Sequence, residues 1–206
     1  MSRKNDTRRW LDSHRRDPWV RAAQADNYRS RAAFKLAQID ERDRLLRPGM
    51  VVVDLGATPG GWSQYCARQL ARRGRIIALD RLAMEPIVGV EFLQLDFTQD
   101  AGLAMLREHL AGAAVDLVLS DMAPNLTGVA VADQMKVMHL AELSLAFCDE
   151  SLKPGGHLVV KVFQGEGFDE LLRDMRGRFR SVAVRKPEAS RDASREMYLV
   201  GRDWRD

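Results

Sequence analysis

The sequence predicts an α/β protein built on a Rossmann-like, doubly wound, mostly parallel sheet of seven strands. Short runs rich in β-branched residues alternate with longer segments of helical period, which is the pattern of strand–helix–strand units. The early runs are apolar almost throughout, as expected for strands that helices cover on both faces. The first four runs each lead into an aspartate, which points to a functional edge of the sheet.

Each element follows from a local pattern. Residues 1–26 are polar, rich in arginine and weakly periodic, and we interpret them as a basic, partly ordered N-terminal arm that precedes a single domain over 27–206. A helix is expected between Asn27 and Arg44, ending before the Pro48-Gly49 break. Strands are expected at 51–55, 76–79, 92–95, 115–119, 158–163, 182–184 and 197–200, with helices near 62–73, 99–111, 133–152 and 168–179.

Composition narrows the class of protein. With 206 residues, 46% hydrophobic and 30% charged, the chain has the composition of an ordinary soluble domain. Its N-terminus is charged from Arg3, and no apolar run approaches the length of a membrane span, so a cytoplasmic protein is expected. Cys66 and Cys148 lie far apart and the four histidines are scattered, so we expect reduced thiols and no bound metal.

The charge is unevenly distributed. Residues 1–47 contain 13 basic and 7 acidic residues, a net of +6, whereas residues 48–206 contain 19 and 22, a net of −3. A basic arm on a near-neutral body suggests a polyanionic partner, although basic termini are often only solvated tails. Trp10, Trp19 and Tyr28 lie among the arginines and would stack on nucleic-acid bases; the alternative is that Trp10 and Trp19 anchor the arm to the body.

Four carboxylates follow four successive strands, at Asp54, Asp80, Asp96 and Asp121. Ligands of open parallel sheets bind beyond the carboxyl ends of the strands, so these side chains should converge on one rim. A single aspartate there could be a helix cap or a turn residue. Four in succession are poorly explained in that way and predict a ligand site.

The loop after the first strand, from Asp54 to Ser63, is rich in glycine. Its spacing differs from the dinucleotide fingerprint, and it lacks the Gly-Lys-Ser/Thr ending of a phosphate-binding loop. Asp80 lies 24 residues after Gly56, where a carboxylate suits a pair of ribose hydroxyls, and Asp96 suits an adenine amino group. The expected ligand is an adenosine without a pyrophosphate, such as S-adenosylmethionine.

Lys161 interrupts an otherwise apolar strand over 158–163. A lysine at such a place must lose hydration, find a partner or extend its amine to water. The alternatives are a packed stem with a solvated amine or a general base. Desolvation and a neighbouring cation would lower its pKa and nearby carboxylates would raise it, so the sequence leaves the choice open.

The sequence resembles the FtsJ/RrmJ family of ribose 2′-O-methyltransferases, whose members act on 23S ribosomal RNA, from about Trp10 to Val200. Each matching segment is moderately specific alone, but together, in the same order, they are highly specific. The segments are Arg29–Leu36, Asp54–Gln64, Ser120–Asn125, Lys161–Gly167 and Ser194–Tyr198.

The resemblance implies a class I S-adenosylmethionine-dependent fold and assigns residues to it. The family's catalytic Lys-Asp-Lys-Glu tetrad falls on Lys35, Asp121, Lys161 and Glu196. Its cofactor-binding positions fall on Gly60, Trp62, Asp80, Asp96 and Asp121. It further implies that Lys161 is the base and that a uridine of the A-loop in 23S rRNA is methylated within the large (50S) subunit. Separately from the resemblance, we expect a monomer.

Other functions fit the sequence less well. Methylation of base amino groups would usually show an Asn/Asp-Pro-Pro-aromatic stretch, and here Pro124 is followed by Asn125. Carbon-5 pyrimidine methylation needs a nucleophilic cysteine, and both cysteines fall in predicted helices. Metal-assisted transfer lacks a ligand set, and the glycine spacing disfavours a nicotinamide dehydrogenase. A non-catalytic RNA-binding ribosome-assembly factor is the alternative from another class, although a pure binder has no need of a buried lysine.

Overall fold

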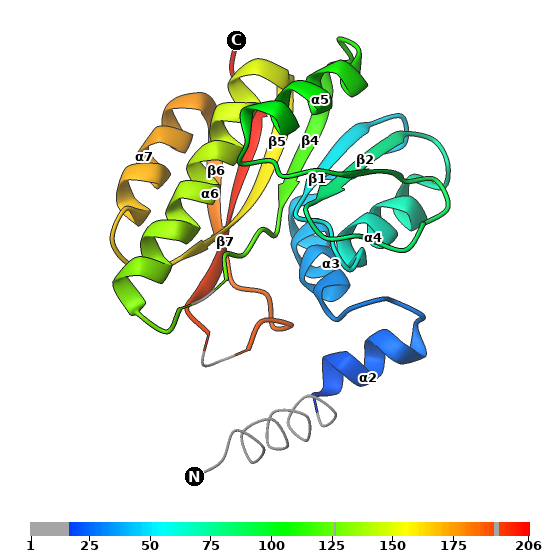
Figure 1. Ribbon diagram of the computed structural model, residues 1–206, viewed down its shortest axis with the longest axis horizontal. Coiled ribbons are helices and arrows are strands. Elements are labelled where there is room, and N and C mark those ends of the chain that lie inside the picture. The colour runs from blue at the N-terminus through cyan, green and yellow to red at the C-terminus, as the bar shows by residue number, and fades with distance from the viewer. Residues whose placement is uncertain (1–16, 126, 192–193) are drawn as a thin grey trace.

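The computed structural model describes residues 17–125, 127–191 and 194–206. These residues form a three-layer α/β structure, with helices on both faces of one seven-stranded sheet (Figure 1). The predicted fold class is therefore confirmed.

The strand order is β3-β2-β1-β4-β5-β7-β6, and β7 alone runs antiparallel to its neighbours. The parallel strands are apolar, and their carboxyl ends meet at one rim, as predicted. The strands are β1 (Val51–Leu55), β2 (Arg75–Asp80), β3 (Glu91–Gln94), β4 (Val115–Ser120), β5 (Leu152–Phe163), β6 (Phe179–Arg185) and β7 (Glu196–Trp204).

Side-chain alternation along the strands divides the core into two parts. Val53 of β1 belongs to the part covered by α5 (Asp100–Leu110), α6 (Ala130–Ser151) and α7 (Phe168–Arg178). Its neighbour Val52 faces the part covered by α3 (Ala32–Asp43) and α4 (Gly61–Leu70). Both faces of the sheet are thus sealed by apolar contacts, which leaves the rims and connecting loops for function.

The chain before the sheet is partly helical. Residues Pro18–Ala25 form α2, which the side chain of Asp17 caps by accepting a hydrogen bond from the Trp19 backbone N–H (2.9 Å). Figure 1 shows α2 beyond α3, outside the two helical layers. The Trp19 ring packs 5.4 Å from Phe34, so this tryptophan anchors the arm, whereas Trp10 lies outside the described residues. The division at residue 26 stays a prediction.

Most element bounds differ from the predicted ones by one to three residues. Three differences are larger: α3 begins at Ala32 rather than near Asn27, β5 begins at Leu152, six residues before the predicted start, and β7 ends at Trp204, four residues after the predicted end. Exposed Lys153, Pro154 and Gly155 open that strand, so its first residues lack the apolar pattern that reveals a buried strand. Among the described helices, none combines the length and hydropathy needed to cross a membrane.

Candidate active site

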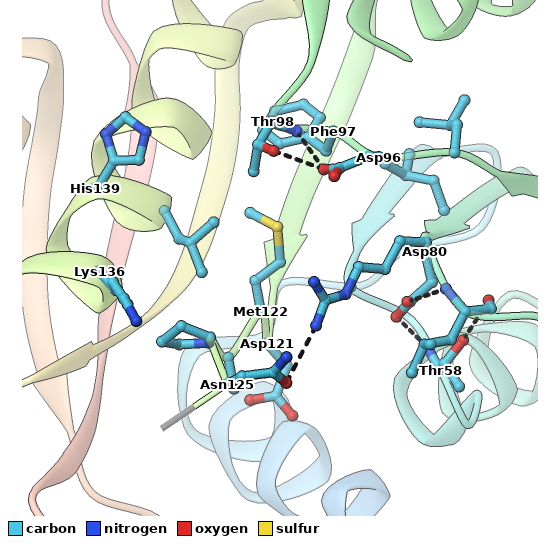
Figure 2. Close-up of a pocket in the computed structure, with 18 residues that line it drawn as sticks. Thr58, Asp80, Asp96, Phe97, Thr98, Asp121, Met122, Asn125, Lys136 and His139 are labelled. Atoms are coloured by element: carbon cyan, nitrogen blue, oxygen red, sulfur yellow. Dashed lines mark hydrogen bonds between the residues drawn. The ribbon is translucent and has the colours of Figure 1, made fainter. Parts of the chain in front are cut away.

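A cavity of about 550 Å³ opens at the carboxyl ends of the central strands, where the strand order reverses between β1 and β4. Open α/β sheets bind ligands at such switch points. The cavity wall comes from the loops after the first four strands and from α6. Three of the four predicted carboxylates line it, namely Asp80, Asp96 and Asp121. Figure 2 shows Asp80 and Asp96 on one side, Lys136 and His139 of α6 on the other, and Met122 between them.

Local hydrogen bonds hold two of these carboxylates in place. Asp80 accepts from the backbone N–H groups of Thr58 (3.0 Å) and Leu82 (2.8 Å), so it joins the loop after β1 to the loop after β2 (Figure 2). Asp96 accepts from the hydroxyl (2.7 Å) and the backbone N–H (2.9 Å) of Thr98 through one oxygen, Oδ1. These hydrogen bonds hold the pKa of Asp96 below its ordinary value, which keeps it charged at neutral pH.

The loops after β1 and β4 approach each other closely at Gly56. Its φ of +77° belongs to the left-handed region, and a Cβ built there would lie 2.6 Å from Met122 Cγ. Only glycine satisfies both the backbone angle and the contact. This glycine of the loop after β1 is therefore what lets the two cavity walls meet.

Asp54 departs from its predicted place. It lies within β1, is completely buried, and does not line the cavity. Its Oδ2 accepts from the Ser63 hydroxyl (2.5 Å), while Oδ1 has no hydrogen-bond partner among the described residues. Burial is the main cause that raises its pKa to about 7, against the lowering effect of the Ser63 hydrogen bond and with help from the charges of Asp121 and Asp80. Because β1 continues past Asp54 to Leu55, this carboxyl group lies within the strand and not at the rim.

Gly60 and Trp62 are the two predicted cofactor positions that do not line the cavity. Gly60, with a φ of +107°, caps α4, and the Trp62 side chain is buried in the core. The indole N–H donates to the Ala32 carbonyl oxygen (2.8 Å), and its ring lies 5.6 Å from that of Tyr198. The Trp62 side chain thus joins α4 to α3 and β7, and contact with a cofactor through this turn stays a prediction.

The four residues of the predicted tetrad come from four elements and form two ion pairs. Lys161 of β5 donates to the Asp121 carboxylate at the end of β4 (3.0 Å) and to its backbone carbonyl oxygen (2.5 Å). Lys35 of α3 donates to Glu196 of β7 (2.6 Å). Both lysines are nearly enclosed, with 8% of Lys35 and 7% of Lys161 exposed. Asp121 lines the cavity as well, so the tetrad and the cavity share a residue.

Tyr198 connects the two ion pairs, although the sequence prediction gave it no role. Its hydroxyl lies 2.9 Å from Asp121 Oδ1 and 3.2 Å from Glu196 Oε1, and it accepts from Lys35 at 3.2 Å. Burial raises its pKa well above the ordinary value, so the hydroxyl keeps its proton for one of the carboxylates. The signal was present in the sequence, because Glu196 and Tyr198 are two residues apart on a strand and must share a face.

The charges of the site balance within it. Burial would raise the pKa of Asp121, but the ammonium groups of Lys161 and Lys35 and the hydrogen bonds from Lys161 and Tyr198 together hold it below its ordinary value. Asp121 therefore stays ionised at neutral pH. The site offers a carboxylate and an amine in contact, next to an open cavity, which suits proton removal from an acceptor placed beside a bound donor.

The sequence pattern of the FtsJ-like methyltransferase family matches residues 28–204, which include every residue of the tetrad and of the cavity wall.

The chain belongs to this family.

Relatives of this FtsJ-like chain match it over its full length. The chain is 58% identical over 205 residues to ribosomal RNA large subunit methyltransferase E of Azoarcus sp. (strain BH72), covering 100% of both chains. It is 55% identical to the protein of the same name from Stenotrophomonas maltophilia (strain K279a), covering 99% of this chain and 97% of that one. A solved Plasmodium falciparum structure, assigned as a candidate ribosomal RNA methyltransferase, superposes with a TM-score of 0.77 at 30% identity, covering 86% and 98%.

Within the described part of this FtsJ-like chain, no group of three or more His, Cys, Asp or Glu side chains is arranged to hold a metal ion. Cys66 and Cys148 are free and buried in α4 and α6, where the sequence placed them. Burial raises the pKa of both thiols, so neither is a reactive thiolate.

Proposed function

We propose that this FtsJ-like methyltransferase transfers a methyl group from S-adenosylmethionine to the ribose 2′-hydroxyl of a uridine in 23S ribosomal RNA. The observation that carries the proposal is the contact between the tetrad and the cavity through Asp121. A donor in the cavity and an acceptor at Lys161 would lie on either side of this one residue. The names of the full-length relatives support the large ribosomal subunit as the substrate.

The cavity suits the adenosine part of the cofactor. Asp80 would accept from the ribose hydroxyls and Asp96 from the adenine amino group, because Asp96 uses only Oδ1 with described residues. Gly56 lines the cavity and has no side chain, so its backbone groups would lie beside the cofactor. Gly60 and Trp62 would contribute backbone groups at the start of α4. When bound, the sulfonium of the cofactor supplies an activated methyl group.

Lys161 would act on the acceptor. Its amine is fixed by two oxygens of Asp121, so its remaining hydrogen or lone pair has a defined direction. A neutral amine there would take the proton of the 2′-hydroxyl while that oxygen attacks the methyl carbon, and the carbon–sulfur bond would break so that S-adenosylhomocysteine leaves. Alignment of the oxygen, the methyl carbon and the sulfur would supply much of the rate.

Lys35 and Glu196 would position the ribose. They form an ion pair on the far side of Tyr198 from Lys161, and the Ser190 hydroxyl donates to the same Glu196 oxygen (3.0 Å). This arrangement keeps both groups in fixed orientation. The ammonium of Lys35 would face the electron-rich oxygens of the acceptor nucleotide.

The arm would orient the RNA. The region up to residue 47 has a net charge of +6, which would contribute a salt-sensitive share of the affinity for RNA. This charge is small for tight and specific binding of free RNA. We therefore propose that the protein acts in the cytoplasm, as a monomer without a metal, on an assembled or nearly assembled 50S subunit. There the shape of the subunit would present the A-loop.

Mass spectrometry of rRNA tests this function. Subunits from cells lacking the protein would be incubated with purified protein and S-adenosylmethionine, and the 23S rRNA then digested and mapped. We expect one new methyl group on a uridine ribose, with Lys161→Ala as the inactive control. Protein-free 23S rRNA would be a much poorer substrate than 50S subunits. Methyl transfer to a base, or subunit binding without transfer, would refute the proposal, and the second result would restore the assembly-factor alternative.

A further inference from the structure

Arg29 lies between the arm and the loops around the cavity. Its backbone N–H donates to Gln64 Oε1 (2.9 Å). Its guanidinium donates to the backbone carbonyl oxygens of Glu85 (2.5 Å) and Pro86 (2.6 Å), and a longer contact of 3.4 Å reaches that of Pro59. Carbonyl groups of two separate loops therefore hold one side chain.

The first of these loops is the turn that starts α4. Pro59 precedes Gly60, and the space beside Gly60 is filled from outside the loop. A Cβ built on Gly60 would lie 2.7 Å from Ile87 Cδ1, 2.9 Å from Met84 Sδ and 3.3 Å from Arg29 Cδ. The stem of Arg29 thus packs on the turn, alongside the segment that its guanidinium holds.

The second loop is the segment after β2. Its first residues, Arg81 and Leu82, line the cavity together with Asp80 at the end of β2, and its later residues 84–87 cover the turn at Gly60. The Thr58 hydroxyl also donates to the Leu82 carbonyl oxygen (3.2 Å), so the two loops are joined at the cavity by Thr58 and on the outside by Arg29.

We propose that Arg29 is a positioning residue for the cofactor and not a phosphate ligand. By holding segment 84–87 on the turn before α4, it fixes the separation between the Gly60 turn and Asp80. The inference rests on the proposed function, since it assumes that an adenosine cofactor lies between these loops. It differs from what the net positive charge of residues 1–47 suggests, namely that Arg29 is one more cation for RNA.

The attachment of the arm does not depend on this guanidinium. The Asn27 carbonyl oxygen accepts from Gln64 Nε2 (2.6 Å) and from Arg68 (3.1 Å), and the Arg68 guanidinium lies 4.1 Å from the centre of the Tyr28 ring. Substitution of the Arg29 side chain should therefore leave the arm on α4. This separates an effect on the cofactor from an effect on RNA.

The test measures the affinity for S-adenosylhomocysteine by calorimetry, without RNA, in the full chain and in Arg29→Ala and Arg29→Lys. We expect affinity to fall roughly tenfold in both, the order of magnitude of one charge-assisted hydrogen bond. Lysine should not rescue, because one ammonium cannot reproduce a fork that spans two loops. Arg173→Ala, which removes an exposed cation of α7, is the matched control and should bind as the unchanged chain does.

Steady-state kinetics on 50S subunits separate the roles. The KM for S-adenosylmethionine should rise in both variants, while kcat at saturating cofactor and the KM for subunits stay within about twofold. Because Arg29→Ala also removes packing, Arg29→Lys decides the matter if the alanine variant fails to unfold cooperatively. Unchanged cofactor affinity in Arg29→Lys, or a raised KM for subunits alone, would overturn the inference. If the chain without substitutions does not bind S-adenosylhomocysteine, that result would instead overturn the proposed function.

Discussion

Replacing Asp54 by asparagine should remove a pH dependence that a buried carboxyl group imposes on the stability of the fold. Asp54 is completely enclosed in β1, and only Ser63 offers it a hydrogen bond among the described residues. Burial, reinforced by the charges of Asp121 and Asp80, raises its pKa from 3.8 to about 7. Asparagine has nearly the same shape and cannot ionise.

The sign follows from the direction of the shift. Because the pKa is raised on folding, the folded protein binds the proton more tightly than the unfolded chain does. The resulting stability is fully present below about pH 4 and is lost as the pH rises through about 7. A shift of this size corresponds to about 4 kcal/mol in total, and roughly 3 kcal/mol of it should disappear between about pH 5 and about pH 8.

Urea unfolding of the two proteins at both ends of this pH range measures the effect. The free energy of unfolding of the unchanged chain should fall relative to that of Asp54→Asn by roughly 3 kcal/mol as the pH rises. Other titrating groups cancel in the comparison, and any fixed penalty of the amide shifts the two curves without changing their slopes. Parallel curves would show that Asp54 does not titrate in this range and would refute the reasoning.

Three further substitutions test the site, and one deletion tests the N-terminal arm. Asp80→Ala should weaken S-adenosylmethionine binding roughly 10- to 150-fold in calorimetry, since charge-assisted hydrogen bonds contribute about 1.5–3 kcal/mol; unchanged affinity in a folded variant would refute the placement of the ribose. Lys161→Arg should lose nearly all single-turnover activity with cofactor affinity intact, because a guanidinium cannot accept the proton; a variant that keeps most of its rate would leave only an electrostatic role. Tyr198→Phe should lower the single-turnover rate and the free energy of unfolding, the latter by about 1–3 kcal/mol, because buried charged groups lose a partner; an unchanged rate would make the hydroxyl purely structural. Deleting residues 1–26 should impair methylation of 50S subunits far more than cofactor binding and flatten its salt dependence, and full activity of the truncated chain would contradict the role of the arm.

The fold was predictable because its central strands, β1, β2 and β4, are buried on both faces. Continuous apolar runs and regular helical segments located all seven strands, and the aspartates at the strand ends located the rim. The start of β5 was missed because Lys153, Pro154 and Gly155, which follow its first residue, are exposed. Antiparallel placement of β7 depends on long-range pairing, which a local pattern does not reveal.

The sequence predicted most residues of the site, but it did not predict which groups those residues contact. Asp54 shares the strand-end pattern of Asp80, yet one more strand residue buries it beneath the loop. Arg29 and Arg31 both belong to the basic region of residues 1–47, whose charge suggested a polyanionic partner. In the structure, Arg29 binds carbonyl groups and Arg31 pairs with Asp17 at the start of α2 (2.5 Å). Such internal pairing depends on how distant segments meet, and charge patterning alone cannot show it.

Because half of the tetrad stands on or beside β7, partial unfolding of the protein can remove catalysis without removing cofactor binding. Glu196 and Tyr198 stand on this strand, paired across from Phe163 and Lys161 of β5, whereas the cavity is built from residues between Gly56 and Leu140. Opening of the β6–β7 hairpin would therefore take apart the tetrad while the cavity keeps its walls. Proteins open in cooperative parts at free energies up to that of global unfolding, and these parts often coincide with supersecondary elements. A protein in that state would still bind its methyl donor and would be unable to use it, so donor binding overestimates the active fraction of a sample.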